Sequence, residues 1–165
     1  MAERPHIIID GYNFVLRQYS IDFTNEHALW DAREKLVHQM IAYLGQKQIR
    51  ITIVFDGQDL KGISEKHRPA GISVRFSKAP QKADPLILEI IRKSNAKKNI
   101  TLVTSDRPLA RLAAGYGCET IGVSEFEQKM VRKQQKFEHT EKYNANLSPK
   151  EIEEWLKIFE NGKED

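Results

Sequence analysis

The chain has 165 residues, of which 40% are hydrophobic and 30% are charged, and its formal net charge is +3. This composition is typical of one globular domain with a real core, and it excludes a chain that is disordered throughout. No apolar run approaches the roughly 18 residues needed to span a bilayer, and residues 1–10 lack the features of a signal peptide, so we expect a cytoplasmic protein. The mild basic excess permits nucleic acid binding without requiring it.

Strand and helix patterns alternate along the chain, which is typical of an α/β domain. Apolar, mostly β-branched runs predict strands over residues 6–10, 50–56, 72–76, 100–104 and 119–122. Apolar residues at helical spacing predict helices over residues 26–46, 84–95, 106–115 and 124–136. Strands that are apolar along their whole length belong to parallel sheets covered on both faces. We therefore expect a central, mainly parallel sheet flanked by helices.

The C-terminal part differs in pattern. Residues 137–147 lose all periodicity and predict a linker, which places the domain at residues 1–136. Ser148 and Glu151 then form a capping box that starts a terminal helix. Its apolar face consists of Ile152, Trp155, Leu156 and Phe159. Amphipathic helices usually bury such a face on their own domain, so we expect residues 137–165 to be a linker and a docking helix; a partner-binding surface is the alternative.

Four aspartates occupy corresponding places in this pattern. Asp10, Asp56 and Asp106 each follow a predicted strand, and Asp84 opens a predicted helix. Parallel sheets bind ligands beyond the carboxyl ends of their strands, so we expect these side chains to converge. Ionised carboxylates close together repel unless a cation or a shared proton compensates them, and Mg²⁺ or Mn²⁺ prefers oxygen ligands. A metal held there favours hydrolysis of a phosphodiester in RNA or DNA.

Each aspartate also has a purely structural explanation. Asp84 and Asp106 stand just before prolines and are good helix N-caps, while Asp56 before a glycine fits an ordinary turn. Four such positions at one edge of one sheet favour a metal site over separate caps. The histidines are scattered and the single cysteine, Cys118, is expected in a buried strand. Nothing therefore indicates a zinc site, a disulfide or a thiol nucleophile.

Four motifs in order resemble those of a known family. They are IIIDGYN at residues 7–13, VFDG at 54–57, KAD at 82–84 and VTSD at 103–106. In combination they resemble the YacP-like NYN-domain family, whose members are relatives of the PIN-domain nucleases. The resemblance implies a PIN-like fold and an Mg²⁺- or Mn²⁺-dependent endoribonuclease acting on single-stranded RNA, associated with ribosomes in some relatives.

The resemblance also implies roles for single residues. Asp10, Asp84 and Asp106 would bind metal, and Asp56 would be a fourth, outer carboxylate. Asn13 and Ser105 would orient carboxylates or metal-bound water through side-chain hydrogen bonds. The chain departs from many relatives at two positions. Lys82 stands in place of threonine, which offers an additional phosphate contact, and Leu88 stands in place of a further glutamate, which removes a metal ligand.

A group of basic residues precedes Asp84 in the sequence and predicts a surface that binds RNA phosphates. The group consists of Arg68, Arg75, Lys78 and Lys82. The alternative for each is an ordinary solvated side chain. The alternative for the whole protein is a catalytically silent module that binds RNA or a ribosomal partner. A phosphatase of the haloacid dehalogenase type is disfavoured, because that chemistry needs a second aspartate two residues after the first, and Tyr12 occupies that position.

Overall fold

The computed structural model describes residues 3–22, 24–57, 69–78 and 80–145, and for residue 134 and residues 136–145 it describes the backbone alone. The chain divides into two compact units, Met1–Glu127 and Gln128–Asp165. The first unit contains the whole described sheet. The described part of the second is the continuation of helix α5 (Val123–Ala145).

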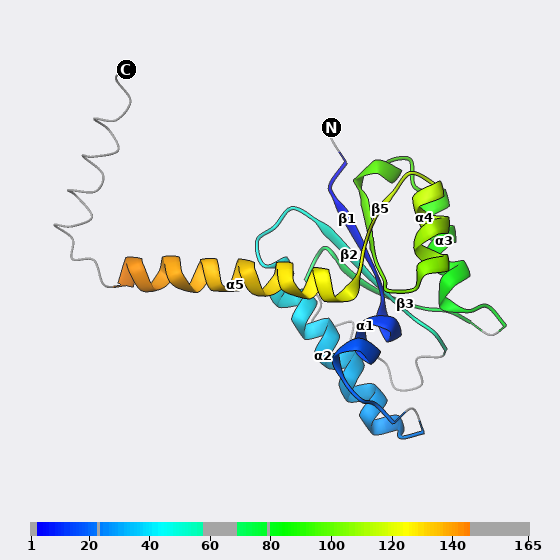
Figure 1. The fold of residues 1–165 in the computed structure, drawn as a ribbon, viewed down its shortest axis with the longest axis horizontal. Helices are drawn as coiled ribbons and strands as arrows, with labels where there is room; N and C mark the ends of the chain where they lie inside the picture. The colour runs from blue at the N-terminus through cyan, green and yellow to red at the C-terminus, as the bar shows by residue number, and fades with distance from the viewer. Residues whose placement is uncertain (1–2, 23, 58–68, 79, 146–165) are drawn as a thin grey trace, which may run out of the picture. The chain divides into compact units, whose positions relative to one another are not determined.

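Five strands form one parallel sheet in the order β3-β2-β1-β4-β5 (Figure 1). The strands are β1 (His6–Asp10), β2 (Arg50–Phe55), β3 (Ile72–Phe76), β4 (Ile100–Val103) and β5 (Glu119–Ile121). The prediction of a central parallel sheet is confirmed, and each predicted strand agrees with the observed one to within a residue.

Helices cover both faces of this sheet. They are α1 (Gly11–Gln18), α2 (Glu26–Leu44), α3 (Ala83–Lys93) and α4 (Arg107–Gly115), with a short 3₁₀ turn, η2 (Lys97–Asn99). Helices α3 and α4 lie on one face, and α1 and α2 lie on the other (Figure 1). Helix α1 was not predicted. None of the described helices is both long and apolar enough to cross a membrane.

Helix α5 differs from its predicted length. It continues to Ala145, so the linker predicted at residues 137–147 is wrong over residues 137–145. Residues 137–145 contain two Glu, one Lys and one Ala, which are good helix formers, but their apolar residues do not recur at helical spacing, so periodicity alone does not predict this helix. The predicted terminal helix, including Trp155, lies outside the described residues.

Successive side chains of a strand point to opposite faces, so each strand contributes to two hydrophobic layers. One layer comprises Ile8, Val54, Ile100 and Leu102 of the sheet with Ala83, Ile87 and Ile91 of α3, Leu109 and Ala113 of α4, and Cys118. Cys118 is buried, as predicted. On the opposite face, Phe14 of α1 and Tyr43 of α2 both contact the ring of Phe126 edge to face.

Gly11 is the point where β1 turns directly into α1. A Cβ atom at this position would lie 2.5 Å from two carbons of the Phe55 ring and 2.9 Å from the carbonyl oxygen of Val54. Real Cβ atoms do not approach other atoms so closely, so glycine alone lets α1 start against β2. This contact positions the residues on either side of Gly11, Asp10 and Tyr12.

Replacing Gly11 should therefore destabilise the fold. We expect Gly11→Ala to lower the free energy of unfolding by about 1–3 kcal/mol, the usual cost of overpacking. Gly115→Ala is the matched control, because a Cβ at Gly115 meets no atom within 4 Å. The control should change stability little or raise it by less than about 1 kcal/mol. Urea denaturation of both variants measures the difference, and equal effects would contradict the packing argument.

Candidate active site

The strand order reverses beside β1. The chain proceeds from β1 to β2 and β3 on one side and then returns to place β4 on the other side of β1. In open parallel sheets, ligands bind in the crevice outside the carboxyl ends of the strands at such a reversal. Asp10 ends β1 and the segment Thr104 to Asp106 follows β4, so both border this crevice.

Asp10 is buried, with 7% of its surface exposed. It is the N-cap residue of α1 but makes no capping hydrogen bond; instead its Oδ2 accepts a 3.0 Å hydrogen bond from the Thr104 hydroxyl. The pKa of Asp10 is raised from 3.8 to about 6. Burial is the largest cause and the charges of Asp84 and Asp106 add to it, whereas the Thr104 hydrogen bond acts in the opposite direction. The buried carboxylate therefore lies within the electrostatic range of two others.

Asp106 is held by backbone contacts. Its Oδ1 accepts a 2.9 Å hydrogen bond from Leu109 N, which caps α4, and its own N–H donates to Thr104 Oγ1 at 3.1 Å. The cap interpretation of Asp106 is thus confirmed. It does not compete with a role in the site, because the same hydrogen bonds fix the carboxylate near Asp10.

Asn13 and Ser105 connect three elements. Asn13 Oδ1 accepts a 2.7 Å hydrogen bond from Ser105 N, and Ser105 Oγ accepts one of 3.2 Å from Val123 N. These contacts tie α1, the segment after β4 and the first residue of α5 together. In the described part of the chain these two side chains bond to backbone N–H groups, whereas the family resemblance implied that they would orient carboxylates or metal-bound water.

Asp56 and Asp84 complete the set. Asp56 follows β2, and its Oδ1 accepts a 2.8 Å hydrogen bond from the hydroxyl of Ser77, a residue with 1% of its surface exposed. Asp84 lies in the first turn of α3, whose N-cap residue is Lys82, so Asp84 itself is not the cap. Partial burial and then the charges of Asp106 and Asp56 raise the pKa of Asp84, while Lys82 lowers it.

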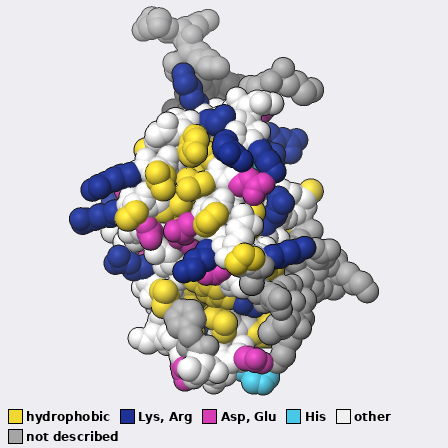
Figure 2. Space-filling view, turned by 90° about the vertical axis from the view of Figure 1, so that its right-hand side faces the viewer, with side chains coloured by type: hydrophobic (Ala, Val, Ile, Leu, Met, Phe, Trp, Pro, Cys, Tyr) yellow, Lys and Arg dark blue, Asp and Glu magenta, His cyan; other side chains and the backbone are white. Residues whose placement is uncertain are grey.

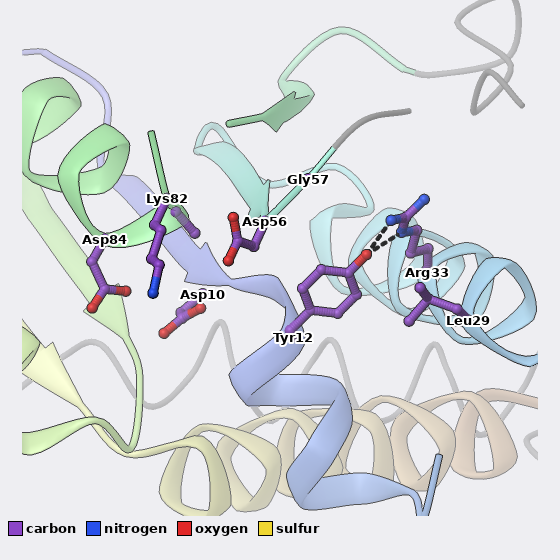
Figure 3. A pocket seen from close by; sticks show the side chains of 9 residues that line it. Asp10, Tyr12, Leu29, Arg33, Asp56, Gly57, Lys82 and Asp84 are labelled. Atoms are coloured by element: carbon purple, nitrogen blue, oxygen red, sulfur yellow. Dashed lines mark hydrogen bonds between the residues drawn. The ribbon is translucent and has the colours of Figure 1, made fainter. Parts of the chain in front are cut away.

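One cavity of about 680 Å³ connects most of these residues. It is lined by Asp10, Tyr12, Leu29, Arg33, Asp56, Gly57, Lys82, Ala83 and Asp84. In Figure 3, Asp10, Asp56, Asp84 and Lys82 lie at one end of the cavity, and Tyr12, Leu29 and Arg33 lie at the other. Asp10, Asp56 and Asp84 thus share one cavity, and the pKa values of Asp10 and Asp84 are both raised by neighbouring carboxylates, of which Asp106 is one.

The residues present suit a hard divalent cation in their donor chemistry. Such ions take carboxylate oxygens, keep several waters and need only one or two direct carboxylates. The buried, uncapped carboxylate of Asp10 beside two further acids is a donor set of that kind. Among the described residues, however, no three His, Cys, Asp or Glu side chains are arranged to hold one metal ion together.

The three predicted phosphate-binding residues that the structure describes are not brought together. Lys82 lines the cavity with the acids, Arg75 lines a separate one of about 340 Å³ with residues of α3, and Lys78 is exposed beyond β3. Arg68 lies outside the described residues. On the face that carries α3 and α4, lysine and arginine side chains surround apolar and acidic ones (Figure 2).

Sequence reasoning missed Thr104, Ser77, Tyr12 and Arg33 as contributors to the site. Thr104 and Ser77 each directly follow a strand, as expected for residues at the ligand-binding edge of a parallel sheet. This position after a strand is the sequence feature that could have predicted them. Arg33 lies on α2, and nothing in its local sequence marks it. Leu88, which replaces a glutamate of many relatives, packs half-buried against the core layer of α3 and α4.

Comparison with known proteins shows the family of this chain and agrees with its fold. A family model described as the YacP-like NYN domain matches residues 7–160. The chain belongs to the YacP-like NYN-domain family. This is a family of PIN-like nucleases. The chain is 27% identical over 101 residues to the uncharacterized protein YacP of Bacillus subtilis (strain 168), an alignment covering 61% of this chain and 59% of the relative, less than two thirds of its length.

Two solved structures share the fold of this YacP-like NYN domain. The crystal structure of Rae1 (YacP) from Bacillus subtilis aligns with a TM-score of 0.69 at 23% identity, covering 95% of this chain and 93% of that one. A tryptophan-to-leucine variant of Rae1 aligns with a TM-score of 0.69 at 21% identity, covering 87% and 85% of the two chains. Both confirm the α/β fold predicted from sequence.

The buried charge of Asp10 predicts a pH-dependent stability. Between pH 4 and 6 the unfolded chain releases the Asp10 proton while the folded chain retains it, so stability falls as pH rises and the loss is complete above about pH 6. The difference between 3.8 and about 6 corresponds to roughly 3 kcal/mol as an upper limit. Asp10→Asn removes this charge, so in EDTA its stability relative to wild type should rise from pH 4 to pH 7 by up to that amount.

Urea denaturation at pH 4, 5, 6 and 7 measures this difference. Asp31→Asn is the control, because Asp31 is exposed on α2 and does not line the cavity; its difference from wild type should stay flat. A flat difference for Asp10→Asn would show that Asp10 ionises as freely in the folded chain as in the unfolded one.

Proposed function

We propose that this chain is a divalent-metal-dependent endoribonuclease that hydrolyses phosphodiester bonds of single-stranded RNA in the cytoplasm. The observation that carries the proposal is the gathering of acidic residues at the reversal of strand order, where Asp84 and Asp106 both raise the pKa of the buried Asp10. Such an accumulation of like charge is unfavourable for the folded chain and indicates a functional site. Membership of a family of PIN-like nucleases supports hydrolysis of nucleic acid.

Asp10, Asp84 and Asp106 would hold Mg²⁺ or Mn²⁺, one or two of them as direct ligands and the rest through metal-bound water, with Asp56 as an outer carboxylate. When bound, the ion supplies charge neutralisation, Lewis acidity toward a phosphoryl oxygen and a lowered pKa for an attacking water. The chain's own residues fix the ligands. Thr104 orients Asp10, and the start of α4 orients Asp106.

The remaining polar residues act around this centre. The hydroxyl of Ser77 holds Asp56. Asn13 and Ser105 hold α1, the segment after β4 and the start of α5 together. In Figure 3 the ammonium of Lys82 lies beside Asp84, where it can contact a phosphate bound near the acids. A lysine at that position binds phosphate as a flexible point charge.

A catalytically silent RNA-binding or ribosome-binding module is the second candidate. The presence of all four acids disfavours it, because a module that only binds RNA gains nothing from placing carboxylates along a phosphate path. As the family resemblance implies, we propose messenger RNA as substrate and the ribosome as a place of action. We also retain the proposal that the residues after α5 include a helix that docks on the nuclease domain.

Substitution of the acids should separate chemistry from binding. We expect Asp10→Asn and Asp106→Asn each to lower the cleavage rate of single-stranded RNA at least about a hundredfold, the loss typical for electrostatic groups at a reacting centre. Binding should be retained, because phosphate contacts come from basic side chains. The assay incubates a mixed RNA pool with Mg²⁺, Mn²⁺ or EDTA and maps new ends. Cleavage that persists in EDTA or in either variant would contradict the proposal.

Lys82 and Arg75, two of the predicted phosphate-binding residues, line different cavities and allow a matched test of the substrate path. Single-strand binding releases about 0.7 counterions per neutralised phosphate, so Lys82→Ala should flatten the dependence of log affinity on log salt by about that much. Arg75→Ala removes the same charge from the other cavity and should leave the slope unchanged. If Arg75→Ala flattens the slope and Lys82→Ala does not, the RNA runs along α3 and β3 instead.

A further inference from the structure

The cavity that contains the acids extends to a second end of different chemistry. That end is lined by Tyr12, Leu29 and Arg33, an aromatic ring, an aliphatic side chain and a guanidinium group. Tyr12 is only two residues from Asp10, so this end directly adjoins the acids (Figure 3). Nothing in the proposed hydrolysis uses these three side chains.

Arg33 is unusual because it is buried, with 9% of its surface exposed, on a helix of the domain surface. Its guanidinium carbon lies 5.3 Å from the centre of the Tyr12 ring, 5.6 Å from that of Phe55 and 5.2 Å from that of Phe76. Its Nε donates a 2.7 Å hydrogen bond to the Tyr12 hydroxyl, and NH2 donates to the same oxygen. Within the described part of the chain, no carboxylate forms an ion pair with it.

A buried guanidinium is costly unless its charge and its donors are satisfied. The three rings supply cation–π attraction, but they accept no conventional hydrogen bond. Both described hydrogen bonds of Arg33 go to the hydroxyl oxygen of Tyr12, although a guanidinium has five N–H groups. The Arg33 side chain therefore lines the cavity with N–H groups for which its described protein contacts provide no acceptor.

The ring of Tyr12 is held in place by neighbouring aromatic rings. It packs at a tilt of 58° against Phe55, with ring centres 5.2 Å apart, and Phe55 in turn stacks on Phe76. Gly11 lets the start of α1 pack against Phe55, and so it fixes the backbone position from which the Tyr12 side chain extends. Tyr12 is thus a pre-positioned aromatic surface, half-buried and lining the cavity beside the acids.

We propose that Tyr12, Leu29 and Arg33 form a nucleobase subsite for a nucleotide adjacent to the phosphate at the acids. The base stacks on the ring of Tyr12 with Leu29 beside it. The guanidinium of Arg33, which can only donate, favours bases that present acceptors on their edge, such as the O6 and N7 of guanine. Stacking of unpaired bases on aromatic rings with arginine donors at their edges is how proteins recognise single-stranded nucleic acid. This inference rests on the proposed function, because it takes the acids to mark the position of the phosphate.

Binding of short RNA oligonucleotides that each carry one abasic nucleotide tests the subsite. The measurements use wild-type chain in EDTA and the Asp106→Asn chain in Mg²⁺, so that the oligonucleotide stays intact. For wild type, an abasic nucleotide at one position should weaken binding by roughly 5- to 150-fold, the range expected for one lost stack. In Tyr12→Leu the same substitution should change affinity less than about twofold, because the ring that senses the base is gone.

Three further variants make the test specific. Tyr12→Phe retains the ring and loses the hydroxyl, so it should keep the abasic penalty. Tyr116→Leu removes an exposed tyrosine that directly follows α4 and does not line the cavity, and should behave as wild type. Leu29→Ala, which leaves the aromatic cluster in place, should reduce the penalty even if Tyr12→Leu proves too unstable to measure. Arg33→Met should lessen any preference for guanine at the sensitive position.

The outcomes separate this inference from the proposed function. If wild type cleaves RNA in a metal-dependent way but no abasic position matters, the nuclease proposal stands and the subsite is wrong. If Tyr12→Leu weakens all oligonucleotides equally and keeps the abasic penalty, Tyr12 only supports the fold and the subsite is again wrong. If no oligonucleotide binds under either condition, both proposals fail.

Discussion

The burial of one carboxylate at the end of a central strand is the constraint on which the site depends. Asp10 can be buried there because the Thr104 hydroxyl donates to it and because β1 lies in the middle of the sheet, between β2 and β4. Its raised pKa reports the energetic cost, to which Asp84 and Asp106 both add. A site built in this way is poised to gain stability from a bound cation, because the cation removes a repulsion that folding alone cannot relieve.

Fold and site share one packing contact. Gly11 allows α1 to start against Phe55, and the same ring supports Tyr12 and the guanidinium of Arg33. The aromatic cluster therefore serves the core on one side and lines the cavity on the other. A sequence change at Phe55 would alter the stability of the domain and the shape of the cavity together, since no flexible segment separates the two.

The sheet and the four aspartates were predictable from sequence because both depend on local pattern. Apolar runs fix strand positions, and a carboxylate after a parallel strand must lie at the same edge as its neighbours. The unpredicted parts depend on tertiary contacts. Helix α1 begins at a glycine, a residue that normally opposes helix formation, and needs Phe55 to explain it. Arg33 acquires its position only when α2 packs on three aromatic rings from other elements.

The hydroxyl that holds Asp56 belongs to Ser77, which directly follows the edge strand β3. An edge strand is paired on one side only, so it opens locally at a smaller free energy than a central strand does. Asp10 is anchored between central strands, whereas Asp56 depends on this edge. On warming below the global transition, the outer carboxylate should therefore be released while the inner one remains fixed. The site then contains one carboxylate, Asp10, that stays in place, and one, Asp56, whose position in the site depends on temperature.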